Sequence, residues 1–263
     1  MTRSYGMSRL LMLLALGVWT TVPLVVLVLQ SLARPWFFPD VLPDALTVSA
    51  WSGVVTGELR NALGRSLGIA IAVGVIAAPV AATVGRAISR LRGRPLHVAT
   101  ALAFLPVAAP PIALATGLQF FMLRAGVGGT VLGVLLSHLV PAAGYLTLYF
   151  LGVFRVYDDR VEEAATTLGA SRWQTIVRVR LALLRRPLAE AAVLGFLVSW
   201  SQYALTLVLG GGAVLTLPLM VQALVRAGQD QEAAVGALVL IVPPTLAIAA
   251  LGLAARRTTV VAA

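Results

Sequence analysis

Residues 162–174 read EEAATTLGASRWQ, and they belong to a polar segment, residues 154–187, that lies between two long apolar runs. The chain is 59% hydrophobic and only 11% charged, with a mean hydropathy of +0.94. Soluble domains carry about 25% charged residues. The composition therefore predicts an all-α integral membrane protein, because a helix satisfies its own backbone hydrogen bonds in lipid.

Six apolar runs are long enough to cross a membrane as helices, since a hydrocarbon core of about 30 Å needs about 20 residues. They are residues 10–33, 64–85, 96–122, 130–153, 188–209 and 233–254. The first run is longer than the apolar part of a secretory signal peptide, about 7–15 residues, so we expect an uncleaved span. The predicted organisation is a first span with an outer loop (1–63), a core membrane domain (64–255) and a cytoplasmic tail (256–263).

The arginines predict the orientation of these spans. Fifteen of the twenty lie in one alternating set of predicted loops, and five lie in the other. Cytoplasmic loops carry the excess of basic residues. We therefore expect both termini, the loop at 86–95 and the segment 154–187 to face the cytoplasm. The net charge of +10 does not indicate nucleic-acid binding, because the arginines flank the apolar runs instead of forming one basic face.

Missing residue types exclude several kinds of site. The chain has no cysteine and no lysine, so it has neither a thiolate nucleophile nor the lysine of a P-loop. Its two histidines, His97 and His138, are too far apart in sequence to indicate a metal site. If ATP drives this protein, we expect a partner to hydrolyse it, and we expect this chain to hold no cofactor or metal.

Local signals in the polar segment predict two short helices joined by a turn. Asp159 is a favourable N-cap, and Glu162 three positions later would complete a capping box. Gly169 would end the first helix in a left-handed conformation. Ser171 and Gln174 have the same spacing and predict a second capping box at the start of the next helix.

The two predicted helices have different apolar faces. The first has a thin stripe of mostly small residues at helical spacing: Val161, Ala164, Ala165 and Leu168. The second has a larger stripe: Trp173, Ile176, Val177, Leu181 and Leu184. An amphipathic connector on the membrane surface would explain the second helix but not the first. Small residues allow close approach, so the first helix is expected to dock against another protein.

One further pattern is carried by Glu163-Ala164-Ala165 and Gly169, followed after nine residues by Val179-Arg180-Leu181. It resembles the EAA motif of permease subunits of binding-protein-dependent ABC importers. Val179 stands where the family pattern has isoleucine, and Ala182 stands where it has proline. Pro187 is expected to take over part of the role of that helix-entry proline.

The resemblance extends over about residues 60–255 and implies a type I importer permease with six transmembrane helices. It implies that the first short helix is the coupling helix in a cytoplasmic coupling loop, 154–187. The residues expected to contact the ATPase are Glu162, Glu163, Ala164, Ala165, Leu168 and Gly169. Glu163 is expected to orient this helix through hydrogen bonds or ion pairs. The alternative role of Glu163 is that of an acid in the first turn of a helix, where it interacts favourably with the helix dipole.

The same resemblance implies partners and a location. The partners would be two ATP-binding subunits that hold ATP and Mg, a second identical or related permease, and an outer solute-binding protein. The location would be a bacterial inner membrane, and the solute a small molecule. The likeness is greatest to the branch that handles polyamines, iron, thiamine or sulfate-like anions.

Polar residues inside the predicted spans are candidates for the translocation pathway. The fifth span contains VSWSQYALT, residues 198–206, in which Trp200, Gln202 and Tyr203 could contact a solute. Gln119 and His138 lie in other spans. Helix–helix hydrogen bonding is the alternative role for all of these side chains, above all for His138. Acids common in the polyamine branch are missing near Gln202, which weakens a polyamine assignment.

Two other classes of protein remain as alternatives. An ion-coupled secondary transporter with an inverted 3+3 repeat would place Pro110-Pro111 and Pro243-Pro244 in its third and sixth spans, as here. Such a transporter usually has acids near span centres, and this sequence has none there. A membrane enzyme would need a nucleophile and a base in one site, and the sequence offers no such set.

Overall fold

The computed structural model describes residues 2–34, 36, 40 and 42–260. Residues 35, 37–39 and 41 of the predicted outer loop, and 261–263 of the predicted tail, lie outside the described residues. The chain forms two compact units, one of residues 1–63 with 217–243 and one of residues 64–216 with 244–263. The predicted division into residues 1–63, 64–255 and 256–263 stays a prediction.

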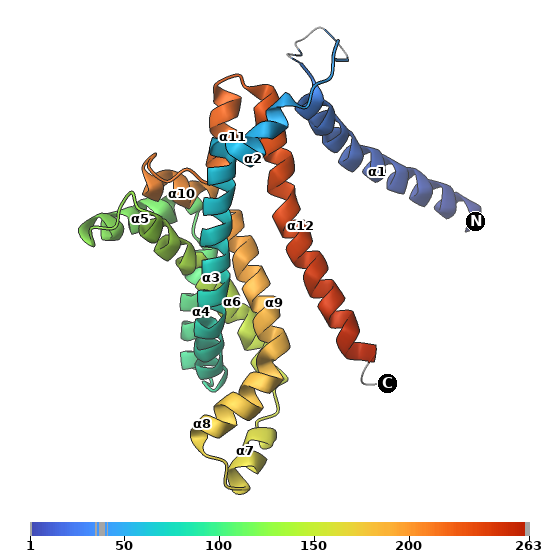
Figure 1. The fold of residues 1–263 in the computed structure, drawn as a ribbon. Helices are drawn as coiled ribbons and strands as arrows, with labels where there is room; N and C mark the ends of the chain where they lie inside the picture. The colour runs from blue at the N-terminus through green and yellow to red at the C-terminus, as the bar shows by residue number, and fades with distance from the viewer. Residues whose placement is uncertain (1, 35, 37–39, 41, 261–263) are drawn as a thin grey trace. The chain divides into compact units, whose positions relative to one another are not determined.

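The described chain is almost entirely helical (Figure 1). Its elements are α1 (Thr2–Leu32), η1 (Ser49–Trp51), α2 (Ser52–Thr56), α3 (Glu58–Ser89), α4 (Arg94–Ala108), α5 (Pro111–Arg124), α6 (Val131–Arg155), α7 (Arg160–Thr167), α8 (Arg172–Gln174), η2 (Thr175–Arg180), α9 (Leu181–Trp200), α10 (Tyr203–Gly210), α11 (Leu217–Arg226) and α12 (Asp230–Val260). This confirms the predicted all-α class.

Four of these helices, α1, α3, α6 and α12, are individually long and apolar enough to cross a membrane. Two bent pairs pass the same test together, α4 with α5 and the helix of residues 172–200 with α10. The described residues therefore hold up to six spans if each bent pair counts as one. The predicted runs at 96–122 and 188–209 are not single straight helices.

The unit of residues 1–63 and 217–243 is held together by short backbone contacts. The backbone N–H of Thr47 donates to Leu32 O (2.6 Å), and the backbone N–H of Arg34 donates to Ala45 O (3.0 Å). These bonds join the end of α1 to the chain before η1. A Cβ added at Gly236 would lie 2.8 Å from Val221 Cγ2, so α11 and the start of α12 approach closely. The apolar side chains of α1 between Leu10 and Val28 are largely exposed.

The unit of residues 64–216 and 244–263 has a core of mostly small and medium side chains, with Phe150 the largest, from α3, α5, α6, α9 and α10. Helix α6 contacts α4, α9 and α10, and α5 contacts α10. Small residues let helices approach closely in lipid. At the tightest place, a Cβ added at Gly74 of α3 would lie 2.3 Å from the carbonyl oxygen of Ala192 on α9.

Prolines explain the break between α4 and α5. Ala109 and Pro110 both precede a proline, and a residue in that position is disfavoured in the helical region. Both adopt extended backbone, with ψ of 136° and 130°. The two helices consequently meet at an angle of 100°. The same residue pair does not always break a helix, because α12 continues through Pro243 and Pro244.

The break between α9 and α10 contains no proline. It falls at Ser201 and Gln202, and the two helices differ in direction by 59°. Side chains satisfy carbonyl groups on both sides of it: Ser201 Oγ donates to Val198 O (2.9 Å), and Thr206 Oγ1 donates to Gln202 O (2.7 Å). Hydroxyl groups of this kind make a helix break tolerable inside a membrane.

The contact at Gly74 gives a prediction on stability. Gly74→Ala should destabilise the protein by about 1–3 kcal/mol, because the new methyl group meets backbone that has no free rotamer to yield. Gly68→Ala is the matched control on the same helix, since nothing lies within 4 Å of its Cβ position. Thermal unfolding in detergent should show a lower midpoint for the first variant alone. Equal midpoints would contradict the close approach of α3 and α9.

Candidate functional site

The segment 159–171 forms a helical hairpin, as predicted. Helix α7 has eight residues and ends at Thr167. Gly169 follows with φ of +88°, a left-handed conformation that favours glycine. The backbone N–H of Gly169 bonds to Thr166 O (3.0 Å), and that of Ala170 bonds to Ala165 O (3.0 Å). This pair of bonds is the Schellman motif, so Gly169 fixes the direction in which the chain leaves α7.

The second helix begins as the sequence predicts and then runs further. Ser171 and Gln174 form the capping box, with bonds of 3.3 Å and 2.8 Å. The helix then passes through a π-helical turn, Thr175–Arg180, into α9. Pro187 lies inside α9, so the prediction that it marks a helix entry is wrong: the helix has already begun at Arg172.

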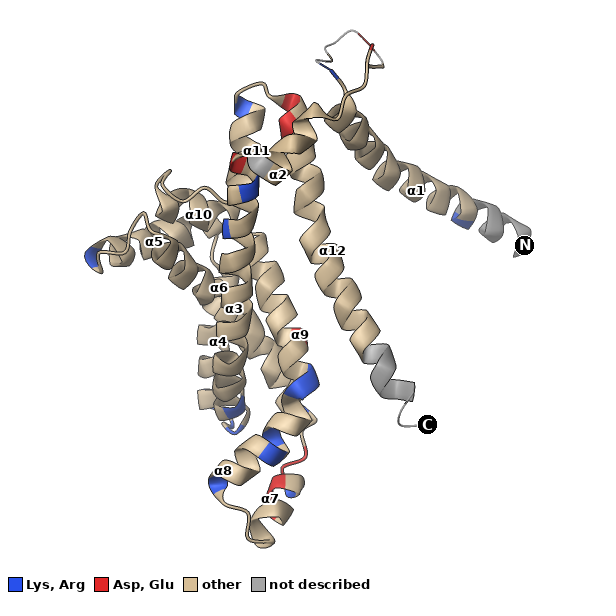
Figure 2. Ribbon diagram, viewed as in Figure 1, with Lys and Arg blue, Asp and Glu red and all other residues tan. Residues whose placement is uncertain are grey.

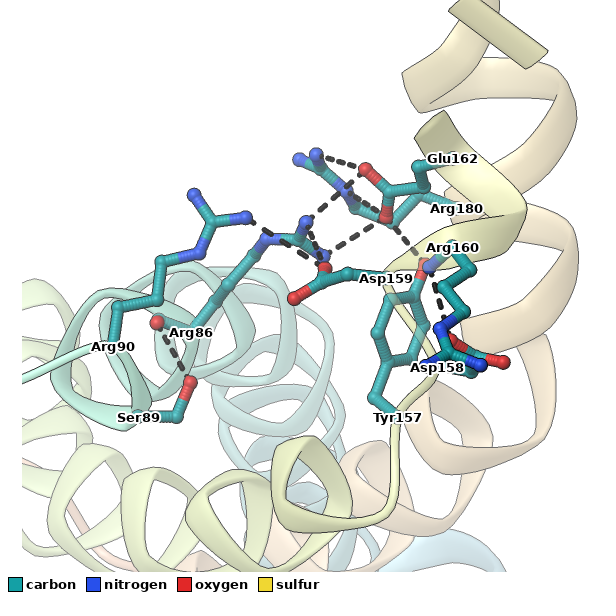
Figure 3. A network of polar contacts seen from close by, with 9 residues as sticks. All are labelled: Arg86, Ser89, Arg90, Tyr157, Asp158, Asp159, Arg160, Glu162 and Arg180. Carbon is teal, nitrogen blue, oxygen red and sulfur yellow. Dashed lines mark hydrogen bonds and ion pairs between the residues drawn. The ribbon is translucent and has the colours of Figure 1, made fainter. Parts of the chain in front are cut away.

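Glu162 is the centre of a polar cluster that we call the Glu162 cluster: Arg86, Tyr157, Asp159, Glu162 and Arg180 (Figure 3). Arg86 of α3 donates two hydrogen bonds to the Glu162 carboxylate (2.9 and 3.1 Å). Arg180 of η2 donates two more (3.0 and 2.7 Å), and the Tyr157 hydroxyl donates a fifth. Glu162 is only 7% exposed. These bonds tie α7 to two other elements of the same unit.

Asp159 also belongs to this cluster, which overturns one prediction. Its carboxylate accepts from Arg86 Nη2 (2.8 Å) and lies 3.7 Å from Arg90 Nη2. Asp159 is the N-cap residue of α7 by position, but its side chain makes no capping bond. The predicted capping box of Asp159 and Glu162 is therefore wrong, because arginines compete for both carboxylates. Asp158 instead accepts from the backbone N–H of Arg160 (3.0 Å).

Charge and burial together set the protonation states in the cluster. Burial alone would raise the pKa of Glu162, but hydrogen bonds from Arg180 and Tyr157 and the charge of Arg86 outweigh it and lower that pKa to about 2. Burial and the bond to Glu162 raise the pKa of Tyr157 to about 12, so its hydroxyl stays a donor. Arg86 also lies over the rings of Phe154 and Tyr157, at 5.6 and 5.2 Å from their centroids.

The other predicted coupling residues lie on the outside of the hairpin. Glu163, Ala164 and Gly169 are exposed, Ala165 is half-buried, and Leu168 is 88% exposed. A shallow cavity of about 350 Å³ opens here, lined by Ala165, Leu168, Gly169, Ala170, Gln174, Arg178 and Val179. Within the described residues Glu163 forms no ion pair. Of the two adjacent acids, Glu162 is thus the one that orients α7 within the chain, and Glu163 faces outward.

The predicted pathway residues lie in the same unit but do not form one open site. His138 is 2% exposed; its Nδ1 lies 2.9 Å from Ser199 Oγ, and its Nε2 lies 3.0 Å from Thr206 Oγ1. Trp200 is buried and stacks on Phe196, with centroids 5.6 Å apart. His138 therefore joins α6 to both sides of the break between α9 and α10.

The remaining pathway candidates lie close to that break or on the helix that packs there. Gln119 Nε2 on α5 donates to Val208 O on α10 (3.3 Å). Gln202 and Tyr203 are half-buried at the break itself. Three of the five candidates therefore lie in the bent segment 199–208, and Gln119 and His138 contact it from other helices. Their roles in transport stay predictions. Glu190 on α9 forms an ion pair with Arg186 (2.9 Å).

Sequence reasoning missed Arg86, Tyr157 and Arg180 as parts of the site. Arg86 was predicted to lie in a loop, whereas α3 extends to Ser89 and carries it into the cluster. A weak signal was present in the sequence, because a buried acid in a helix requires a basic partner. The sequence contains too many arginines near Glu162 for that signal to select the right ones.

The chain belongs to the family described as "binding-protein-dependent transport system inner membrane component", whose model matches residues 70–260. It is accordingly a multi-pass inner-membrane protein of a transport system. Spermidine/putrescine transport system permease protein PotC of Escherichia coli (strain K12) is 26% identical over 170 residues, covering 65% of this chain and 64% of PotC. The PotC of Haemophilus influenzae is 26% identical over 156 residues, covering 59% and 61%.

The inner membrane ABC transporter permease protein YnjC of Escherichia coli (strain K12) is 29% identical over 153 residues, covering 58% of this chain and 30% of YnjC. The chain thus matches less than two thirds of the length of these relatives. A bacterial ABC transporter that imports the acidic polysaccharide alginate has a similar fold, with a TM-score of 0.67, 18% identity, and coverage of 95% and 96%. At this identity the likeness shows the fold alone.

The two adjacent acids should behave differently when neutralised. Glu162→Gln should destabilise the protein by about 3 kcal/mol, because Arg86 and Arg180 would lose the charge that compensates them. Glu163→Gln is the matched control and should change stability by less than about 0.5 kcal/mol. Thermal unfolding in detergent measures both. If both variants unfold at the same temperature as the wild type, Glu162 does not hold α7.

The lowered pKa of Glu162 also predicts a pH dependence. A carboxyl group whose pKa is lowered on folding stabilises the protein above its ordinary pKa of about 4.3, and loses this effect as pH falls toward 2. The difference in midpoint between the wild type and Glu162→Gln should be constant from pH 7 to pH 5.5 and should shrink below pH 4.3. Taking the difference cancels the other carboxyl groups. A difference that shrinks already near neutral pH would contradict the lowered pKa.

Proposed function

We propose that this chain is the permease subunit of an ATP-driven ABC importer, and that it forms part of the solute pathway and couples to a separate ATPase subunit. The observation that carries this proposal is the hairpin at α7, which combines the EAA pattern with an outward face of small residues and an exposed Leu168. Membership of the transport family supports it.

In this proposal α7 is the coupling helix. Its outer face, Glu163, Ala164, Leu168 and Gly169, docks on the ATPase, while the Glu162 cluster fixes its inner side to α3 and η2. Closure of two ATPase subunits around ATP and Mg would push α7, and the cluster would pass that movement to α3 and α9. ATP hydrolysis belongs to the partner, and this chain holds no cofactor of its own.

The same proposal includes an orientation and two further partners. Both termini and the hairpin face the cytoplasm of a bacterium, as the arginine distribution predicts. A second permease, identical or related, completes the pathway. An outer solute-binding protein delivers the solute; a transporter of similar fold is described in complex with an alginate pentasaccharide-bound periplasmic protein (TM-score 0.71, 14% identity).

The class of solute is the next part of the proposal. PotC is described as a spermidine/putrescine permease, yet the pathway candidates of this chain include no acid. A cationic solute would therefore have to rest on the aromatic face of the half-buried Tyr203, because Trp200 is buried against Phe196. We propose a small solute recognised at the bent segment 199–208, with its charge matched mainly by the binding protein.

The structure weighs against the ion-coupled alternative. An inverted 3+3 repeat would give the third and sixth spans equivalent breaks. Pro110 and Pro111 accompany a break of 100°, whereas α12 runs through Pro243 and Pro244 without one. The two proline pairs are therefore not equivalent, and the repeat has no structural support.

Leu168 provides the test of coupling. Leu168→Ser should weaken binding of the ATPase subunit about tenfold or more, because burying a leucine side chain contributes about 1.5–3 kcal/mol. Val156→Ser is the matched control: Val156 is 86% exposed, close to the 88% of Leu168, but lies before the hairpin of residues 159–171. Co-purification of the ATPase and solute-stimulated ATP hydrolysis measure the effect.

Two results would contradict the proposed coupling. One is transport driven by an ion gradient in this chain alone, and the other is ATPase binding that Leu168→Ser leaves unchanged. Both serine variants should unfold at the wild-type temperature, because neither side chain is packed in the chain. This separates a docking role from a general loss of structure.

A further inference from the structure

A second cavity, of about 590 Å³, lies away from the hairpin face, between the end of α3, the start of α4 and the end of α6. Its volume is within the range of small-molecule sites, about 300–1,000 Å³. None of the residues discussed as coupling or pathway candidates lines it. It lies entirely in the unit of residues 64–216 and 244–263.

The two helices that form its walls touch at one end of the cavity and separate at the other. A Cβ added at Gly144 of α6 would lie 2.9 Å from Ala103 O and 3.0 Å from Val107 Cγ2 of α4, so the helices are in close contact there. The cavity begins beside this contact, at Phe104 next to Ala103 and at Leu148 one turn after Gly144, and extends toward the start of α4 and the end of α6. The close contact therefore closes its deep end.

The lining changes from apolar to polar along this direction. Phe104, Leu148 and Leu151 line the deep part. The polar side chains at the helix ends that form the mouth are Ser89, His97 and Arg155, with the apolar Leu96 and Phe154 beside them. His97 Nδ1 is bonded to Gly93 O (2.8 Å), which turns its other ring nitrogen away from that turn. The mouth thus holds the charged side chain of the lining beside two apolar ones, and the interior is largely apolar, as an amphiphile requires.

Arginine positions, blue in Figure 2, gather where α3 ends and α4 begins. Arg92 lies in the short turn between α3 and α4, Arg94 is the first residue of α4, and Arg155 is the last residue of α6. In the part of the chain that the structure describes, these three arginines form no ion pair. They contrast with Arg86 and Arg90, whose charges are met by Asp159 and Glu162.

We propose that this cavity binds one anionic phospholipid, with an acyl chain between α4 and α6 and the phosphate at Arg155. Arginine-lined pockets between membrane helices on the cytoplasmic side match the charge of such headgroups. The proposal rests on the proposed function in one respect: it needs the arginine-rich end of the bundle to face the cytoplasmic leaflet. The bound lipid would brace α4 against α6 beside the Glu162 cluster.

The test uses the purified transport complex, with phosphatidylglycerol as the probe and phosphatidylcholine as the neutral comparison. Native mass spectrometry counts the lipids retained at increasing lipid concentration. We expect the wild type to retain phosphatidylglycerol at lower concentration than phosphatidylcholine. Arg155→Gln should raise the phosphatidylglycerol concentration needed by about fivefold, which corresponds to one arginine near the membrane surface.

Two more variants separate charge from space. Ala101→Trp fills the cavity without changing charge and should remove the retained lipid. Arg124→Gln is the matched control, since it removes one arginine from the same unit but at the end of α5, where Arg124 lies over Phe120. It should bind lipid as the wild type does. If Ala101→Trp does not fold, the comparison of Arg155→Gln with Arg124→Gln decides.

Equal retention of both lipids, or wild-type retention in Arg155→Gln, would overturn the proposal. So would a chemical crosslink from the cavity to a helix of a second subunit, because that helix would then be the occupant. Lipid retention is measured without ATP or solute. If the lipid test fails while the ATPase binds normally, only the lipid inference is contradicted. If the lipid binds as expected while Leu168→Ser leaves ATPase binding unchanged, only the coupling proposal is contradicted.

Discussion

The bonds from Arg86 and Arg180 to the single carboxylate of Glu162 are the interaction on which the hairpin depends. Arg86 is 76 residues away in sequence and Arg180 is 18 residues away. A buried ion pair gains little net free energy when all its groups are satisfied, but losing one partner is costly. The cluster therefore acts less as a source of stability than as a constraint: α7 can occupy one position relative to α3 and η2.

This constraint is needed because α7 has few other means of staying in place. An eight-residue helix is too short to be stable by itself in water. Its apolar side chains are mostly exposed in the chain, so they contribute little burial. Adjacent helix positions differ by about 100° in direction, so Glu162 can point into the cluster while Glu163 points outward. One turn of α7 thus carries both Glu162, which bonds to the rest of the unit, and Glu163, which faces outward.

Local chemistry made part of this site predictable from the sequence. Gly169 and the pair Ser171–Gln174 act through bonds to their own neighbours, and both were identified correctly. Asp159 was misassigned because the competing arginine comes from α3, far away in sequence. The same contrast applies to the helix breaks. Pro110 and Pro111 each restrict the residue before them, whereas the break at Ser201 and Gln202 contains no proline that could have predicted it. Helix α12 shows that a proline pair does not always break a helix.

The position of the cluster determines what a movement of α7 must do to the rest of its unit. Arg180 directly precedes α9, a helix of 20 residues and so about 30 Å in length, which ends at Trp200 beside the bent segment. His138 bonds to Ser199 and Thr206, one on each side of that bend. Thr206 already donates its hydroxyl hydrogen to Gln202 O, so it accepts from His138 Nε2, and Ser199 donates to Nδ1. A displacement of α7 that leaves the Glu162 cluster intact must therefore move α9 as well. At the far end of α9, that movement must either shift the whole bent segment together or break a hydrogen bond to His138. The residues expected to contact the solute lie at this same bend between α9 and α10.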